Sequence, residues 1–251
     1  MSLIRPIRTP FRLDAAQLDA HRLTRIRQGG DQLLDAQLAL QKKQHSVLSS
    51  LMPKTRVFSL WDHYPAGEVS DLSTACQYYY HSHRTTPQEH GHFHLFGLLN
   101  ADGSTRAPNS RWAENEAPSH LIAISMSPQG MPVKVFCPNQ WVTNGYWLTA
   151  DQILVHLENF IVNAQPRWAV VGRWLAGFVQ LFWPQIESAL RARDERVKGL
   201  RRGRQWRTFW ADESIEVINY IPIDLHQQVG KLEGMKPAKQ AIAGQLRSAQ
   251  Y

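Results

Sequence analysis

The sequence predicts an α+β protein in which an antiparallel sheet packs against a helical layer and follows an N-terminal helical hairpin. Helical patterns come first, short strand-like segments joined by Pro, Gly, Asn and Asp occupy the middle, and apolar helical patterns follow. A chain of 251 residues with 43% hydrophobic content can bury one large core. We therefore expect a helical arm over residues 1–53, a single α+β domain over 54–230 and a loosely ordered tail over 231–251.

The N-terminal hairpin is predicted from two helical patterns separated by glycine. Asp14 begins a polar pattern that runs to about Gln28, and the pair Gly29-Gly30 is expected to break it. A leucine-rich pattern then continues to Pro53. Two helices joined in this way are expected to pack antiparallel.

The sheet is predicted from the segments that follow residue 55. Residues 56–61 have a strand-like pattern, whereas the segment WDHYPAGEVSD over 61–71 is rich in turn formers and is expected to be a loop. Consecutive short strands indicate antiparallel pairing. The four further strands are expected at 74–83, 90–99, 120–127 and 133–137.

The helical layer is predicted over residues 149–198. Thr149 is expected to cap a helix that ends near Asn163, and a second helix, apolar on nearly all sides, begins near Arg167. Pro184 must either kink this second helix or begin a new one. A last strand is expected over 215–225.

Composition argues against a membrane protein, a secreted protein and a site built on a CxxC motif. The most hydrophobic run, residues 168–183, is too short to span a membrane and contains Arg173. The N-terminus does not have the features of a secretory signal, so we expect a cytoplasmic protein with no membrane association. Cys76 and Cys137 form no CxxC motif and are expected to be buried and reduced.

The net charge of +7 is concentrated in one stretch. Residues 191–207 contain eight basic residues against Asp194 and Glu195. Such a stretch can bind phosphates or nucleic acid, and Trp206 offers a stacking face. Charged helix ends are usually solvated, however, and no groove-entering motif accompanies this one. The sequence therefore favours a small-molecule partner over a nucleic acid.

A dense group of histidines marks the predicted functional centre. Eleven histidines in 251 residues predict about 0.6 in a window of fourteen, yet residues 81–94 hold five. Side chains alternate faces along a strand, so the histidines of each strand share one face. If His83 lies opposite His90, then His81 lies opposite His92, and all five imidazoles are expected to point the same way.

Imidazoles gathered in this way predict a divalent transition-metal site. Facing residues of an antiparallel pair are close enough for two imidazoles to reach one ion, and imidazole suits Zn, Fe, Cu or Ni better than Mg or Ca. Glu89 and His90 could either ligate or act as acid or base. The four residues expected to ligate are His81, His83, His92 and His94.

Acidic and histidine side chains outside the hairpin could complete the site. Asp62 and His63 precede the hairpin and could supply a ligand or a general base, or could form a surface turn. Glu68 and Asp71 are candidate ligands and also candidate partners for the ligands' second ring nitrogens, and the sequence does not separate these roles. His120 begins a strand that could reach the rim of the site.

The connection from Asn139 to Trp147 is rich in aromatic and amide side chains. A loop of this composition could close over a pocket and hold a small polar substrate by stacking and hydrogen bonding. Its tryptophans could equally pin it to the core. Both interpretations stay open from the sequence.

A cluster of histidines can also be a pH-sensitive group or a packed aromatic face. Tyr and Phe side chains interleave with the histidines, which favours the packed face. Against this, several imidazoles on one desolvated face repel one another when protonated and contribute little packing that Leu or Val would not provide better. The metal site is the favoured interpretation.

Several motifs resemble those of an uncharacterised bacterial family that is classified as a domain of unknown function. The similarity covers roughly residues 30–225, and it implies a bacterial, enzyme-sized domain without implying a reaction or a substrate. The motifs that carry the resemblance are WDHYPAGEVSD, QYYYHSHR, EHGHFHLF, HLIAISMSPQGMPV and NQWVTNGYW.

A shorter resemblance involves the segment HGHFHLF alone. It is similar to the HxHxHxx signature of histidine-triad nucleotide hydrolases and transferases, in which the middle histidine attacks phosphorus. Carried over, His92 would be the nucleophile. The fold layout of that family is not evident around the segment, and the resemblance leaves His81 and His83 unexplained.

The sequence therefore predicts a metal-dependent enzyme that acts on a small molecule, either a hydrolase or an oxygenase. An open coordination position would activate water or dioxygen. Two alternatives remain: a histidine-triad-like phosphotransferase or nucleotide hydrolase, and a non-catalytic protein that binds metal or nucleic acid.

Overall fold

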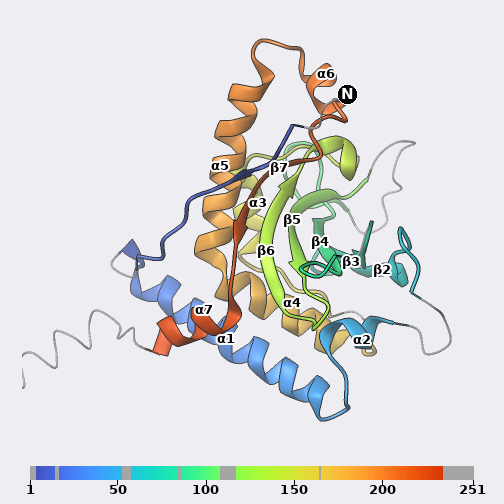
Figure 1. Ribbon diagram of the computed structural model, residues 1–251, viewed down its shortest axis with the longest axis vertical. Helices are drawn as coiled ribbons and strands as arrows, with labels where there is room; N and C mark the ends of the chain where they lie inside the picture. Colours follow the sequence, from blue (N-terminus) through green and yellow to red (C-terminus); the bar gives the residue numbers. More distant parts are fainter. Residues whose placement is uncertain are drawn as a thin grey trace, which may run out of the picture.

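The structure, a computed structural model, describes residues 4–14, 17–52, 58–83, 86–107, 117–163 and 165–233. It confirms the α+β class, because helices pack against a seven-stranded mixed sheet that is mostly antiparallel (Figure 1). In sheet order the strands are β1 (Ile7–Arg8), β7 (Val217–Pro222), β6 (Pro132–Pro138), β5 (Ser119–Met126), β4 (Gly91–Gly97), β3 (Cys76–His81) and β2 (Tyr64–Asp71).

The four strands expected between residues 74 and 137 are confirmed as β3 to β6, each within a few residues of its expected ends. The last expected strand is β7, which pairs with β6. The N-terminal strand β1 was not predicted, and it runs parallel to β7 at the edge of the sheet. A strand of two residues is too short to have a recognisable sequence pattern.

Helices form a layer against the sheet and a long N-terminal arm. α5 packs against β6 and β7, and α1 packs along α4. Pro184 begins a new helix, which was one of its two expected roles. The helices are α1 (Ala20–Gln41), α2 (Val47–Leu51), α3 (Ala150–Leu157), α4 (Ala169–Leu181), α5 (Trp183–Arg201), α6 (Trp206–Trp210) and α7 (Leu225–Glu233).

The expected break at Gly29-Gly30 is wrong, because α1 runs through both glycines. A Cβ on Gly29 would lie 2.5 Å from the Cβ of Gln180 and 2.9 Å from the carbonyl oxygen of Gly177 in α4. The glycines therefore let two helices approach closely, and the lost helix propensity is offset by packing. The hairpin partner of α1 is the short α2 rather than a second long helix.

The segment predicted as a loop over 61–71 instead forms the edge strand β2. Its turn formers are accommodated by an irregularity, since the register with β3 shifts between Tyr64 and Val69. Gly67 and Glu68 have positive φ there. The strand expected at 56–61 is not found in residues 58–61, and residues 53–57 lie outside the described part of the chain.

The helix that follows Thr149 ends earlier than expected. Thr149 caps α3 through a reciprocal capping box with Gln152, as its position predicts, but the helix stops at Leu157 rather than near Asn163. Phe160 and Val162 remain buried in an irregular segment. An apolar pattern alone does not reveal that difference, because burial continues after the helix ends.

The two faces of the central strands have different partners. Phe93 and the alternate residues of β3 and β4 point into the core, where the Phe93 ring lies 6.2 Å from Trp174 of α4. The opposite face carries the histidines. Cys76 and Cys137 are buried and free, as expected. Among the helices that the structure describes, none has the length and apolarity needed to cross a membrane.

Candidate metal centre

Three histidines from two adjacent interior strands form the centre of the site. β3 and β4 pair antiparallel with His81 opposite His92, which is the register predicted from the spacing, and with Tyr79 opposite His94. Because side chains alternate along each strand, these residues share one face. Cross-strand neighbours on the next strand are small: Ser125 lies opposite His92 and Ala123 opposite His94. These small side chains leave room for the imidazole rings of the three histidines to approach one another.

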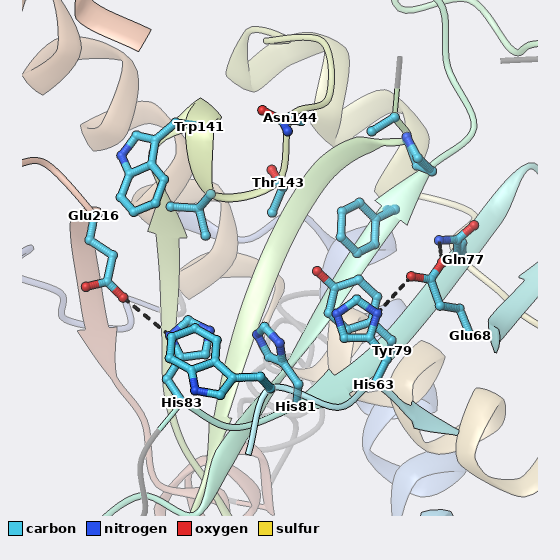
Figure 2. Close-up of a pocket in the computed structure, with 15 residues that line it drawn as sticks. His63, Glu68, Gln77, Tyr79, His81, His83, Trp141, Thr143, Asn144 and Glu216 are labelled. Atoms are coloured by element: carbon cyan, nitrogen blue, oxygen red, sulfur yellow. Dashed lines mark hydrogen bonds and ion pairs between the residues drawn. The ribbon is translucent and has the colours of Figure 1, made fainter. Parts of the chain in front are cut away.

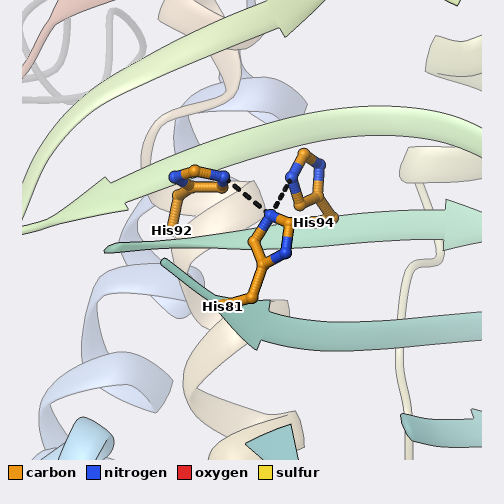
Figure 3. A group of neighbouring side chains, drawn as sticks. All are labelled: His81, His92 and His94. Atoms are coloured by element: carbon orange, nitrogen blue, oxygen red, sulfur yellow. Dashed lines mark hydrogen bonds between the residues drawn. The ribbon is translucent and has the colours of Figure 1, made fainter. Parts of the chain in front are cut away.

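The imidazoles converge through the same ring nitrogen (Figure 3). The Nε2 atom of His81 lies 2.9 Å from Nε2 of His92 and 3.1 Å from Nε2 of His94. Among the described residues, these three form the group of side chains that could hold a metal ion. All three are nearly inaccessible to solvent, with exposed fractions of 7%, 9% and 1% for His81, His92 and His94.

Glu89 orients the outer nitrogen of His92. Its Oε1 atom lies 3.3 Å from Nδ1 of His92 and accepts a hydrogen bond from the hydroxyl of Ser125, while Lys134 pairs with Oε2 at 2.7 Å. Burial alone would raise the pKa of Glu89, but the hydrogen bonds from His92 and Lys134 outweigh it and lower the pKa to about 2. The carboxylate is therefore ionised and holds a proton on Nδ1 of His92.

His120 plays the corresponding part for His94. Its Nε2 atom lies 2.9 Å from Nδ1 of His94. A register shift in the pairing of β4 with β5 brings His120 opposite Phe96 and onto the histidine face. Strict alternation from Ala123 would have placed His120 on the core face. The sequence therefore predicted His120 only at the rim of the site, whereas the bulge places it in direct contact with His94.

Burial keeps these imidazoles neutral. Desolvation is the main cause that lowers the pKa of His81 to about 2 and that of His120 to about 3. It also lowers the pKa of His94 well below its usual value and, despite Glu89, lowers that of His92. A neutral imidazole offers a lone pair, which is the form that binds a metal.

His83 lies beside the three histidines without joining their contact. Its ring centroid is 4.6 Å from that of His81 and 5.3 Å from that of His92. The ring stacks on Trp61, and Nδ1 lies 3.7 Å from a carboxylate oxygen of Glu216. His83 was predicted to ligate, and the structure places it at the margin of the cluster.

His63 reaches the site from the segment before β2, as its position in the sequence suggested. It stacks on Tyr79 with ring centroids 3.8 Å apart, lies 5.3 Å from the ring of His81, and contacts Glu68 through Nδ1. Asp62, its neighbour, is exposed and lines a cavity that His63 also lines but that none of the three histidines of the cluster reaches. Asp71 is buried and accepts hydrogen bonds from Ser73.

The expectation that all five hairpin histidines point the same way is wrong for His90. Its Nδ1 atom lies 2.7 Å from the hydroxyl of Tyr80, a core-facing residue, and its ring packs on Phe58. His90 precedes β4, where strand alternation no longer applies. The neighbouring Gly91 packs so tightly that a Cβ would lie 2.4 Å from the carbonyl oxygen of His81.

Two cavities flank the cluster on the histidine face. The first has a volume of about 620 Å³ and reaches His81, and the second has a volume of about 320 Å³ and reaches His92 and His94. Both include His83 and Glu216 in their walls. Figure 2 shows His81 at the floor of the first cavity, between His83 on one side and His63 on the other.

The loop after β6 forms part of the wall of the first cavity. Trp141, Thr143 and Asn144 line it, in the place predicted for a loop that closes over a pocket. The same Trp141 is also anchored, since its indole N–H donates to the carbonyl oxygen of Ile215. The two interpretations of this loop are therefore compatible.

The basic stretch 191–207 lies on α5 and the segment that follows it, and it does not line either cavity beside the histidines. Several of its charges are paired within the fold: Arg193 with Asp194, Lys198 with Glu195 and Arg204 with Asp212. This pairing reduces the charge that the stretch presents to a phosphate backbone.

The chain matches the model of a known family. The model of a family described as a domain of unknown function (DUF6969) matches residues 27–223, which confirms the family resemblance predicted from the motifs. No curated protein and no solved structure matches the chain.

Proposed function

We propose a function from the chemistry of the site. The chain belongs to the DUF6969 family, which is described only as a domain of unknown function and so indicates no activity. In this proposal His81, His92 and His94 hold one divalent transition metal, and the metal activates water or dioxygen for reaction with a small molecule. The convergence of three Nε2 atoms is the observation that carries the proposal.

Two of the three separations between the nitrogens are close to those expected around a tetrahedral ion. Metal–imidazole bonds of about 2.0 to 2.1 Å at tetrahedral angles separate neighbouring nitrogens by about 3.3 Å. The two separations from His81, 2.9 and 3.1 Å, are within a few tenths of an ångström of that value. The ligand nitrogens of all three histidines lie within 4.8 Å of one another, so the rings would have to rotate to admit the ion.

The proton count also supports a cation at this point. Because Nδ1 of His92 donates to Glu89, its Nε2 atom carries a lone pair. If Nδ1 of His94 donates to His120, its Nε2 atom carries a lone pair too. At most one proton, on His81, is then shared among three buried nitrogens. A metal ion satisfies all three lone pairs at once, which a single proton does not.

The outer contacts match those that metal-binding histidines usually make. Such ligands donate their second ring nitrogen to a carboxylate or another acceptor, which fixes the ring and raises its basicity. Glu89 supplies this contact for His92, and His120 supplies it for His94.

Three protein ligands leave a coordination position for the reaction. In catalytic zinc sites a water takes that position and its pKa falls to about 7, which makes hydroxide available at neutral pH. Iron or copper in the same place would bind dioxygen. The adjoining cavities, about 620 and 320 Å³, have the size expected for a small-molecule substrate.

Elemental analysis of protein prepared without an affinity tag and without added metal tests the proposal. We expect close to one transition-metal ion per chain, and zinc or nickel would favour the hydrolase whereas iron or copper would favour the oxygenase. The double variant His81→Ala/His92→Ala should lose the ion. The matched control His21→Ala/His226→Ala removes two exposed histidines and should retain it.

Two outcomes would contradict the proposal. One is a metal content that stays the same in the double variant, with circular dichroism showing that the variant is folded. The other is wild-type protein that holds no metal and binds none when zinc, iron, copper or nickel salts are supplied. Phosphate covalently attached to His92 after incubation with a nucleotide would instead support the histidine-triad alternative.

A further inference from the structure

We propose that one water molecule is bound in a small cavity beside His120, where it accepts hydrogen bonds from Nδ1 of His120 and from the side-chain amide of Asn139. Through this water, Asn139 is a positioning residue for His94, one of the three candidate ligands. The water follows from hydrogen bonding alone, so it is expected with or without a metal. Its effect on metal affinity rests on the proposed function.

The small cavity lies where β5, the end of β6 and α5 meet. His120, Asn139 and Arg193 are among the described residues that line it, and its volume of about 20 Å³ is room for about one water molecule. His120 is absent from the described walls of the two larger cavities beside the cluster. A water buried here needs two to four polar partners.

Asn139 supplies the first partner. Its exposed fraction is 0%, so its side-chain amide has no access to bulk solvent. Oδ1 accepts a hydrogen bond from the backbone N–H of Gln140 at 2.9 Å, whereas Nδ2 has no partner among the described residues. Buried amide N–H groups are costly to leave unpaired and are rarely found so. A water in the cavity that Asn139 lines provides the missing acceptor.

The second partner follows from the order of protons along the histidines, which burial keeps neutral. A neutral imidazole has one N–H and one lone pair. Because Nδ1 of His92 donates to the ionised Glu89, Nε2 of His92 has the lone pair. Nε2 of His81 lies 2.9 Å from that lone pair and therefore carries a proton. Nε2 of His94 faces the same proton at 3.1 Å, so it also presents a lone pair (Figure 3).

This order continues to His120. With its lone pair on Nε2, His94 has its proton on Nδ1 and donates it to Nε2 of His120 at 2.9 Å. The proton of His120 is then on Nδ1. A metal ion that replaces the proton of His81 requires the same lone pairs on His92 and His94, so the order is unchanged. His120 and Asn139 each bring a buried donor to one cavity, and the two lone pairs of a water match them.

Arg193 does not supply the acceptor that these donors need. It is the charged residue among the described residues of the wall, and a guanidinium has donors only. Its Nε and Nη2 atoms donate to a carboxylate oxygen of Asp194, and Nη2 also donates to the carbonyl oxygen of Leu148. Donors on three sides of a water-sized space favour a water over an empty cavity.

The water matters to the proposed metal centre because it holds the last ring of the series. His120 supports His94 only while Nε2 of His120 is the acceptor. In the other tautomer, with the proton on Nε2 of His120, His94 would have to accept at Nδ1 and carry its proton on Nε2, where no metal can bind. Outer contacts of this kind orient metal-binding histidines.

Two measurements on the wild-type protein test the inference. In a high-resolution crystal structure we expect a water within about 2.7 to 3.2 Å of both Nδ1 of His120 and Nδ2 of Asn139. Nitrogen-15 NMR of the imidazoles distinguishes the two tautomers, with the signals of His120 identified by their loss in His120→Gln. We expect the proton of His120 on Nδ1, both before and after removal of metal with a chelator.

Variants at Asn139 test its positioning role. Asn139→Leu removes the amide and fills the space of the water, so we expect His120 to populate both tautomers and metal affinity to fall by about three- to tenfold. Asn139→Asp keeps the acceptor for the N–H of Gln140 and can accept from the water, so it should restore the Nδ1 tautomer. The matched control is Asn159→Leu, which changes an exposed amide and should leave tautomer and affinity unchanged.

The inference is overturned if the cavity holds no water, or if the proton of His120 is on Nε2. It is also overturned if folded Asn139→Leu has the same tautomer and metal affinity as Asn159→Leu. Should Asn139→Leu fail to fold, the wild-type structure and its NMR spectrum decide. Protein that binds no metal but has the water and the Nδ1 proton would reject the proposed function and retain this inference, whereas metal beside an empty cavity would do the reverse.

Discussion

Acidification of the metal-free protein should unfold it at an unusually mild pH. His81, His92, His94 and His120 are held neutral, chiefly because burial lowers their pKa values. In the unfolded chain each imidazole regains a pKa of about 6.5. The unfolded state therefore binds more protons, so the free energy of unfolding is unaffected above that value and decreases as the pH falls below it.

The loss can be estimated from the number of buried imidazoles. At about pH 5.5, each histidine that stays neutral in the folded state costs about 1.4 kcal/mol of stability. Three to four such groups give about 4 to 6 kcal/mol, with the lower figure if His92 takes up a proton beside Glu89. Because domains are stable by roughly 5 to 15 kcal/mol, a metal-free protein at the lower end of that range should unfold at about pH 5 to 5.5.

Urea denaturation followed by circular dichroism measures this loss at about pH 7.5 and about pH 5.5 after metal removal. The variant His21→Ala/His226→Ala should lose as much stability as the wild type, because both removed histidines are exposed. Glu89 does not contribute to the change between these two pH values. Folding lowers the pKa of its carboxyl from 4.5 to about 2, so the stabilisation it provides is lost only below about pH 4.5. A change smaller than about 1 kcal/mol between the two pH values would refute the claim that these imidazoles are buried and neutral.

Three further predictions concern the site and the helical arm. Glu89→Gln should weaken metal binding by about 10- to 100-fold, measured by competition with a chromophoric chelator, and unchanged affinity would show that Glu89 does not support His92. A metal that binds only the folded state should raise Tm, with about 4 kcal/mol of added stability at a free concentration a thousandfold above Kd, and an unchanged Tm would count against a specific site. Gly29→Leu should lower stability by about 1 to 3 kcal/mol, because the leucine side chain would collide with α4. The control Gly199→Ala has open space at its Cβ and should raise stability by up to about 1 kcal/mol. Equal effects of the two variants in thermal melts would contradict the role assigned to Gly29.

The core of the site could be predicted from the sequence because it depends on strand alternation. The spacing of the hairpin places His81 opposite His92, and the structure has that register. Alternation holds only inside a strand, however. His90 lies just outside β4 and turns to Tyr80, while a bulge in β5 brings His120 to the histidine face. Neither departure leaves a pattern in the hydrophobic sequence, because both depend on backbone pairing with a distant strand.

The errors in the fold have a similar origin. Glycine and proline were interpreted as signals of local breaks, but Gly29 serves the contact between α1 and α4. Pro65 and Gly67 lie within an irregular edge strand. In both places a partner that is remote in the sequence determines the structure, and local propensity is overridden by packing.

In the proposed function, the residues that would hold the metal and those that would contact the substrate lie on different parts of the fold. The three candidate ligands lie on β3 and β4, which are hydrogen-bonded on both sides within the sheet. Their backbone positions are fixed by ladder pairing, and small neighbours such as Ala123 leave room for their rings. The wall of the larger cavity comes in part from segments beside the sheet, such as the loop that carries Trp141. Such segments tolerate substitution better than interior strands, so under the proposed function the residues that contact a substrate could change while the three histidines stay the same.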